Sequence, residues 1–155
     1  MTTTYTSPTI DQIAISADGS GDVVPNCGDC TFGTASTTIV VGDIGVCTIL
    51  PAFHVPVDLI GDIGDCDSGS ALVFEVGFVA NDSGADDDPD AFGSGYTTGQ
   101  AGGVFRANSA GFMRIAAADH DRKVGIQVTT AGVSPSTPGV VSITMLSRRA
   151  ITGRD

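Results

Sequence analysis

The sequence predicts an all-β protein, either an antiparallel β-sandwich or a jelly-roll-like barrel with long loops rich in glycine and aspartate. The 155 residues include 21 Gly and no Trp, and Glu75 and Lys123 are the single glutamate and lysine. Helical proteins need many Glu, Lys, Gln and Leu residues, whereas Thr, Val and Gly favour strands and turns. Short apolar stretches also alternate with turn residues about every 8–12 positions, as in sandwiches and barrels.

The first part of the chain differs in composition from the rest. Residues 1–37 are rich in Thr, Ser, Gly and Asp, and only 10–16 (IDQIAIS) has the pattern of a short strand. The following stretch, "ADGSGDVVPNCGDCTFGTAS", is dense in turn-forming residues. We therefore expect 1–37 to be an N-terminal arm or edge segment and 38–155 to form the β-sandwich domain.

Regular strand signals begin at Thr38. The stretches expected to form strands are 38–42, 45–53, 54–64, 71–80, 102–107, 111–117, 122–130 and 139–149. A turn of helix would fit only within 109–123. The last two strands, with the proline-containing loop between them, are expected to pair as a hairpin.

Three of these strands alternate clearly, which predicts one buried face each. The residues expected to face inward are Leu72, Phe74, Val76 and Phe78, then Val124, Ile126 and Val128, and finally Val141, Ile143 and Met145. The strand 71–80 is apolar on both faces, which predicts a homo-oligomer.

The charge excludes two classes of partner. The chain has 7 basic and 18 acidic residues, so its net charge is −11, and its pI is about 4.1. Because nucleic acids and anionic membranes attract Lys and Arg, we expect binding to neither. The N-terminus has no basic region followed by an apolar one, so we expect no signal peptide and synthesis in a cytosol.

The four cysteines leave three states open: free thiols, at least one disulfide, or a metal site. Cys27 and Cys30 form a C-x-x-C, whereas Cys47 and Cys66 stand alone. A four-thiolate zinc site usually has two close pairs, and a redox C-x-x-C needs a following helix. Cys47 and Cys66 are expected to be small buried apolar residues.

The sequence contains no recognisable catalytic motif, and we expect no enzyme. His120 lies between Asp119 and Asp121, a pattern that indicates a solvated turn. His54 has no nucleophile at a spacing typical of a catalytic motif. Glu75 is either a carboxylate with a raised pKa or an outward residue on a half-exposed strand. Its small neighbours on that face favour the second interpretation.

The acidic segment 81–96, "NDSGADDDPDAFGSGY", is the best candidate for a metal site. It fails the EF-hand pattern, because Gly84 and Gly93 stand where acidic ligands are required. A looser Ca²⁺ site formed by Asp86, Asp88 and Asp90 remains possible. Glycosidases also use paired carboxylates, but they bind sugars on aromatic side chains. Only 6% of this chain is aromatic, which argues against a glycosidase. We expect mainly a long solvated connection between strands, with no firm cofactor.

Parts of 40–150 together resemble small capsid-associated proteins of tailed bacteriophages. The matching pieces are the "LP" at 50–51, the Asp-rich turn at 61–67, the strand core at 74–77, "DPDAF" at 88–92 and the Thr/Ala-rich closing strands at 126–146. The resemblance implies a head decoration (cement) protein or another auxiliary virion protein, built as a β-sandwich and often trimeric on the capsid surface. No catalytic residues carry over.

The resemblance therefore implies a structural virion protein that decorates and stabilises a capsid. Its expected partners are the major capsid protein and copies of itself, and its expected location is the virion after synthesis in the host cytoplasm. One alternative is a head-fibre or tail adhesin that binds host-surface glycans. A second is a Ca²⁺-dependent binding module or a small hydrolase.

Overall fold

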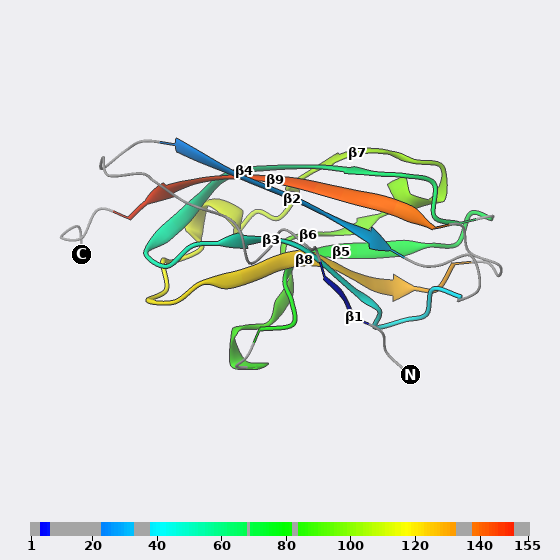
Figure 1. Cartoon of the computed structure of the whole chain (residues 1–155), viewed down its shortest axis with the longest axis horizontal. Helices are drawn as coiled ribbons and strands as arrows, with labels where there is room; N and C mark the ends of the chain where they lie inside the picture. Colours follow the sequence, from blue (N-terminus) through cyan, green and yellow to red (C-terminus); the bar gives the residue numbers. More distant parts are fainter. Residues whose placement is uncertain are drawn as a thin grey trace.

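The structure is a computed structural model that describes residues 4–6, 23–32, 38–67, 69–81, 84–132 and 138–150. Within these ranges nine strands form two sheets, which lie one above the other in Figure 1. The strands are β1 (Thr4–Thr6), β2 (Val23–Phe32), β3 (Ile44–Leu50), β4 (His54–Ile63), β5 (Val73–Phe78), β6 (Asp88–Tyr96), β7 (Gly103–Arg106), β8 (Arg122–Thr130) and β9 (Gly139–Arg149). Three short 3-10 turns are η2 (Gly84–Asp86), η3 (Thr98–Gln100) and η4 (Phe112–Arg114).

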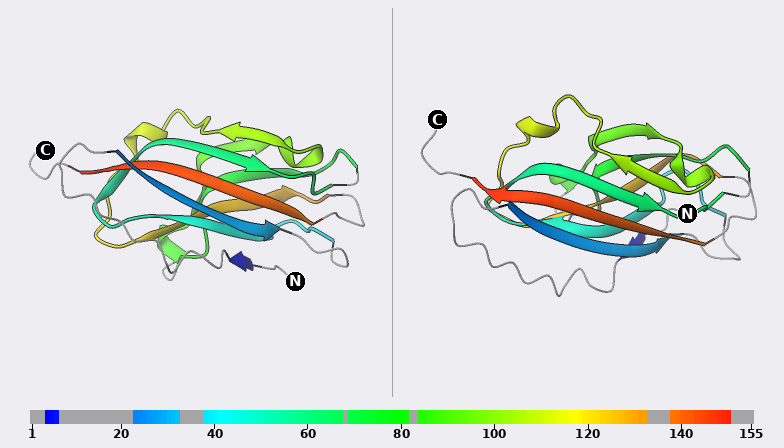
Figure 2. Two further views of the ribbon diagram at one scale, coloured as in Figure 1. Left: turned by 45° about the horizontal axis from the view of Figure 1, so that its top comes forward. Right: turned by 90° about the horizontal axis from the view of Figure 1, so that it is seen from above.

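The two sheets confirm the all-β sandwich. One sheet has the order β1-β3-β8-β5-β6 and the other has the order β2-β9-β4-β7. All pairings are antiparallel except that of β1 with β3, which is parallel. Among the described residues no strand pairing joins one sheet to the other, so the molecule is an open sandwich and not a closed barrel. Figure 2 shows the two sheets from two further directions, with their strands twisted and not flat.

The core lies between the facing sides of the sheets and is rich in aromatic rings. Phe74 of β5 is fully buried and packs on Tyr96 and Phe105, with ring centroids 5.5 and 5.4 Å apart. Phe92 meets Phe78 in an edge-on contact at 5.0 Å. The contact of Phe74 with Phe105 joins the two sheets, whereas the other two contacts join β5 to β6 within one sheet.

The predicted inward faces are confirmed. Leu72 just before β5 and the three residues predicted on β5, the three on β8 and the three on β9 are at most 3% exposed. Strict alternation of side chains across a strand explains why these predictions hold without knowledge of the neighbouring strands. No helix among the described residues is long and apolar enough to span a bilayer.

The predicted hairpin of the last two strands is wrong. β8 lies in the five-stranded sheet between β3 and β5, whereas β9 lies in the other sheet between β2 and β4. Each strand has one apolar face, and the two faces meet across the core instead of lying side by side. The connection therefore crosses from one layer to the other.

Two predicted strands are turns. In 38–42, Val40 donates its N–H to Asp43 Oδ2 at 3.0 Å, and Gly42 has a φ of 89°. This closes a turn directly before β3, although the segment is β-branched. In 111–117, η4 is a single helical turn that buries Phe112, so the expected turn of helix is found there.

The turn-rich sequence around the C-x-x-C forms a strand. β2 pairs with β9 over ten residues, from Val23 opposite Arg148 to Phe32 opposite Gly139. It is an edge strand, so backbone pairing on one side outweighs its poor strand composition. The predicted short strand at 10–16 lies outside the described residues, and the division at residue 37 stays a prediction.

Candidate functional site

The acidic segment forms a turn and an edge strand in place of the expected long loop. η2 leads into β6, which pairs with β5 through Phe74–Tyr96, Val76–Gly93 and Phe78–Asp88. The register shifts twice, so the pairing is irregular. Apolar anchors within the segment explain the strand, because Phe92 and Tyr96 enter the core. The acidic residues thereby acquire fixed positions on the rim of the five-stranded sheet.

The three proposed calcium ligands have different side-chain partners in the structure. The carboxylate of Asp86 lies 3.2 Å from His120 Nε2. Asp88 and Asp90 adjoin each other on β6, where burial and the hydrogen bond to Asp90 raise the pKa of Asp88. Among the described residues, no group of three or more His, Cys, Asp or Glu side chains is placed to hold a metal ion. Calcium binding by these residues stays a prediction.

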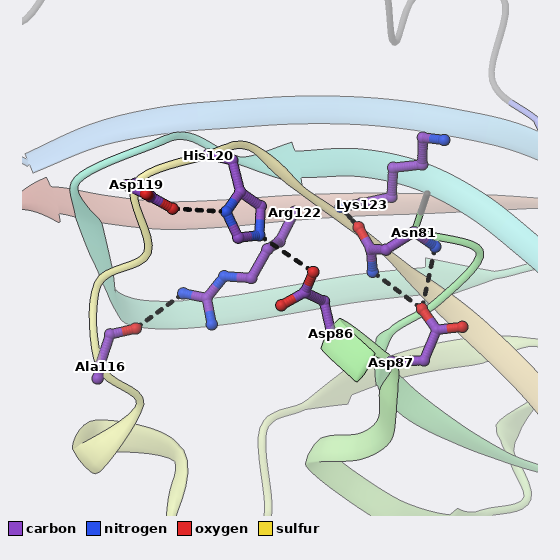
Figure 3. Close-up of polar contacts among 8 residues, drawn as sticks. All are labelled: Asn81, Asp86, Asp87, Ala116, Asp119, His120, Arg122 and Lys123. Atoms are coloured by element: carbon purple, nitrogen blue, oxygen red, sulfur yellow. Dashed lines mark hydrogen bonds and ion pairs between the residues drawn. The ribbon is translucent and has the colours of Figure 1, made fainter. Parts of the chain in front are cut away.

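His120 connects the acidic segment to the loop before β8, as Figure 3 shows. Its Nδ1 lies 2.8 Å from Asp119 Oδ1 while its Nε2 faces Asp86. The hydrogen bond to Asp119, and then the charge of Asp86, raise the pKa of His120. Both ring nitrogens are therefore occupied by carboxylates, which suits a pH-sensitive link between loops and not a general base acting on a nucleophile.

A second set of contacts holds the start of the acidic segment. Asp87 Oδ1 accepts from the backbone N–H of Asn81 at 3.0 Å and from its side-chain amide at 3.1 Å. Asn81 Oδ1 in turn accepts from the backbone N–H of Lys123 at 2.7 Å. Figure 3 shows these contacts beside the His120 link. Together they tie Asp87, which follows η2, to Asn81, and they attach Asn81 to Lys123 of β8.

Arg122 lies beneath the same cluster. Its guanidinium carbon is 4.2 Å from the centre of the Phe78 ring, and Nη2 donates to the carbonyl of Ala116 at 2.8 Å. Burial lowers the pKa of Arg122, while the charge of Asp86 acts in the opposite direction. The side chain therefore serves as a packed cation that orders the loop before β8.

Glu75 lies with the acidic residues of β6 and does not form a catalytic pair. It is half-buried, and burial raises its pKa, followed by the charges of Asp90 and Asp88. The three carboxylates thus repel one another on the outer face of β5 and β6. The expected outward position of Glu75 agrees with this arrangement.

The C-x-x-C cannot act as one unit. Cys27 and Cys30 are three positions apart on β2, so their side chains point to opposite faces. Cys27 is exposed, whereas Cys30, Cys47 and Cys66 are buried, and all four cysteines are free thiols. The prediction that Cys47 and Cys66 are buried apolar residues is confirmed, and burial raises the pKa of Cys66 to about 12.

A buried polar network at one end of the core was not predicted from the sequence. Ser147 Oγ lies 3.1 Å from Asn26 Nδ2 and 3.1 Å from His54 Nδ1, and Thr48 Oγ1 donates to the Asn26 carbonyl at 3.3 Å. Burial, and then the charge of Arg149, lower the pKa of His54. The four residues come from β2, β3, β4 and β9. The sequence signal that could have indicated the network was Ser147, a polar residue at an inward position of β9.

Chains from two phage capsids are similar in structure to this protein. A chain of the capsid of Ralstonia phage GP4 superposes with a TM-score of 0.80 and 28% sequence identity, covering 96% of this chain and 99% of that chain. A chain of the cyanophage Pam1 capsid superposes with a TM-score of 0.64 and 20% identity, covering 89% and 94%. No protein-family model and no curated protein matches the sequence.

Both similarities extend over the whole sandwich and not over a single hairpin. The Pam1 likeness, at 20% identity, shows the fold alone. The GP4 likeness adds sequence identity over nearly the full length of both chains. The structural neighbours are therefore phage capsid chains, in agreement with the resemblance found in the sequence.

Proposed function

We propose that this protein is a structural component of a bacteriophage capsid, and that it decorates the outer surface of the shell and reinforces it. The observation that carries the proposal is the near-complete match to a chain of the GP4 capsid, with a TM-score of 0.80. The decorating role rests on the sequence resemblance to cement proteins.

The chemistry of the described residues supports a structural role without enzymatic activity. Carboxylates occupy both ring nitrogens of His120, and His54 bonds to Ser147 inside the core. The aromatic core packs strands of both sheets together, which gives a stiff unit suited to repeated placement on a lattice. The net charge of −11 favours solubility at the high local concentration of a particle surface.

The proposed partners are the major capsid protein and further copies of this chain, arranged as a trimer. The proposed location is the virion, after synthesis in the host cytoplasm. Light scattering on the purified protein tests self-association, and a mass of three chains is expected. A monomer at every concentration would contradict the trimer. Capsid binding is tested separately by the particle experiments.

Quantitative mass spectrometry of purified particles tests the virion role. We expect this chain in high copy number relative to tail proteins, with a fixed ratio to the major capsid protein. Its absence from particles would overturn the proposal. A few copies per particle would instead favour the tail or head-fibre adhesin.

Deletion of the gene separates decoration from shell building. A decorating protein adds to a finished shell, so particles lacking it should assemble and then release DNA at a lower temperature than complete particles. Adding the purified protein back should restore the higher temperature. Failure of shells to assemble without the chain would show that it builds the shell, and the decorating role would be wrong.

A further inference from the structure

Two buried thiols from opposite sheets lie in contact. Cys30 Sγ of β2 and Cys47 Sγ of β3 are 3.3 Å apart, and the side chains are 1% and 0% exposed. The strands approach closely here, because a Cβ on Gly28 would collide with the carbonyl oxygen of Cys47. We propose that Cys30 and Cys47 form an inter-sheet disulfide once the protein leaves a reducing cytosol, and that this bond locks the edge strand β2 onto the sandwich.

The other two cysteines are placed differently. Cys27 lies on the outer face of β2, where its sulfur accepts a hydrogen bond from Thr144 Oγ1 at 3.5 Å. Cys66 Sγ faces the carbonyl oxygen of Gly64 at 3.1 Å. Among the described residues, Cys30 and Cys47 are therefore the two sulfurs in direct contact. This selects one pairing where the sequence left all pairings open.

Little movement separates the thiol pair from a disulfide. A disulfide has sulfurs about 2.05 Å apart, so the two Sγ atoms must approach by a little over 1 Å. β2 pairs with a neighbour on one side only, and Pro25 lacks a backbone N–H. A small shift of an edge strand, or rotation about one Cα–Cβ bond, costs less than a shift of a central strand.

The reaction requires an oxidant, which we take to be a small disulfide such as glutathione disulfide. One cysteine thiolate attacks a sulfur of this disulfide, which releases one glutathione thiolate and leaves a mixed disulfide. The second cysteine thiolate then attacks the protein sulfur and releases the second glutathione. Cys30 and Cys47 together lose two protons and two electrons, and glutathione disulfide is reduced to two thiols.

Burial makes the step slow in the folded protein. The hydrogen bond to Cys30, and then burial, raise the pKa of Cys47, so little of its reactive thiolate is present near neutral pH. Oxidation therefore depends on transient opening of β2. We expect it within seconds to hours during refolding, and more slowly in the native protein.

The experiment compares the full chain refolded with glutathione disulfide and with excess reductant. With the oxidant, the mass should fall by the two hydrogens lost, and two of the four thiols should no longer react in denaturant. Closing a loop of 17 residues should raise Tm by about 5–10 °C, and reductant should reverse the rise.

Peptide mapping identifies the linked pair. Trypsin is unsuitable, because the first Lys or Arg in the sequence is Arg106, beyond all four cysteines. Cleavage before aspartate places each cysteine in a separate peptide, since Asp29, Asp43, Asp65 and Asp67 divide them. A single non-reduced species joining the Cys30 and Cys47 peptides is expected.

Matched variants complete the test. Cys27→Ser combined with Cys66→Ala leaves only the proposed pair and should still lose both thiols on oxidation. Cys47→Ser should lose the Tm increase, and the double variant keeps the test informative if Cys47→Ser fails to fold. Four free thiols after oxidative refolding, a link through Cys27 or Cys66, or a disulfide that leaves Tm unchanged would each overturn the proposal.

Discussion

The hydroxyl of Tyr96 donates a 2.6 Å hydrogen bond to the backbone carbonyl of Arg106. Tyr96 ends β6 in the five-stranded sheet, and Arg106 ends β7 in the four-stranded sheet. The same ring packs against Phe74 and Phe105, which also contact each other. One side chain thus ties the edge strand that carries the acidic residues to the opposite layer.

We expect Tyr96→Phe to lower the free energy of unfolding by about 0.5–1.5 kcal/mol, because the ring contacts stay and only the hydrogen bonds of the hydroxyl, to Arg106 and Asn108, are lost. Urea denaturation measures the change. Ser94→Ala, an exposed substitution in the same strand, is the control and should change stability by less than about 0.5 kcal/mol. Equal stabilities of Tyr96→Phe and wild type would show that the hydroxyl contributes nothing.

Gly77 allows β5 and the start of β6 to approach. A Cβ at this position would collide with the backbone carbonyl of Asp88. Gly77→Ala should therefore destabilise the protein by about 1–3 kcal/mol or more, since backbone atoms must move. Gly84→Ala is the matched control, because nothing lies within 4 Å of its added methyl group. Thermal unfolding that ranks the two variants equally would contradict the close approach.

Asp67 organises the connection before β5 from a buried position. Its Oδ1 accepts from the N–H of Gly69 at 3.1 Å, and its Oδ2 accepts from those of Ala71 and Leu72 at 2.9 and 2.8 Å. Asp67→Ala should cost about 3 kcal/mol, because three backbone donors lose a charged acceptor. Chemical denaturation measures this, and the exposed Asp62→Ala serves as control. A cost of under about 1 kcal/mol would contradict this role.

His54 should make the protein less stable in weak acid. Its pKa is lowered in the folded state from an ordinary value of 6.5 by burial and by Arg149. Below pH 6.5 the unfolded chain therefore takes up a proton that the folded protein binds less well, so stability falls until the pH reaches the folded pKa. His54→Gln should flatten this part of the stability profile. An unchanged acid slope in the variant would refute the assignment.

His120 should act in the opposite direction. Asp119 and Asp86 raise its pKa above 6.5 in the folded state. Its stabilising contribution is fully present below pH 6.5 and is lost as the pH rises through the folded pKa. The stability difference between wild type and His120→Asn should therefore be larger at pH 5.5 than at pH 8.5. Raised salt should reduce this difference, because the group is exposed.

Local patterns in the sequence were sufficient for the fold class and for the inward faces of β5, β8 and β9. Alternation reports directly which side of a strand is apolar, whatever its neighbours are. Composition and charge likewise favoured strands over helices and argued against polyanionic partners. The expectation that Cys47 and Cys66 are buried followed from the general tendency of isolated cysteines to behave as small apolar residues.

The strand partners and the sites depended on tertiary structure. β8 and β9 lie in different sheets, and β2 and β6 are strands despite turn-rich or acidic sequences, because hydrogen bonds to distant strands and buried anchors such as Phe92 outweigh local propensity. The contacts of Cys30 with Cys47 and of His54 with Ser147 also depended on tertiary structure, because the partners are 17 and 93 positions apart in the sequence. Sequence alone determined which apolar side chains of the alternating strands avoid water, and only the packing of the two sheets decided which side chains meet.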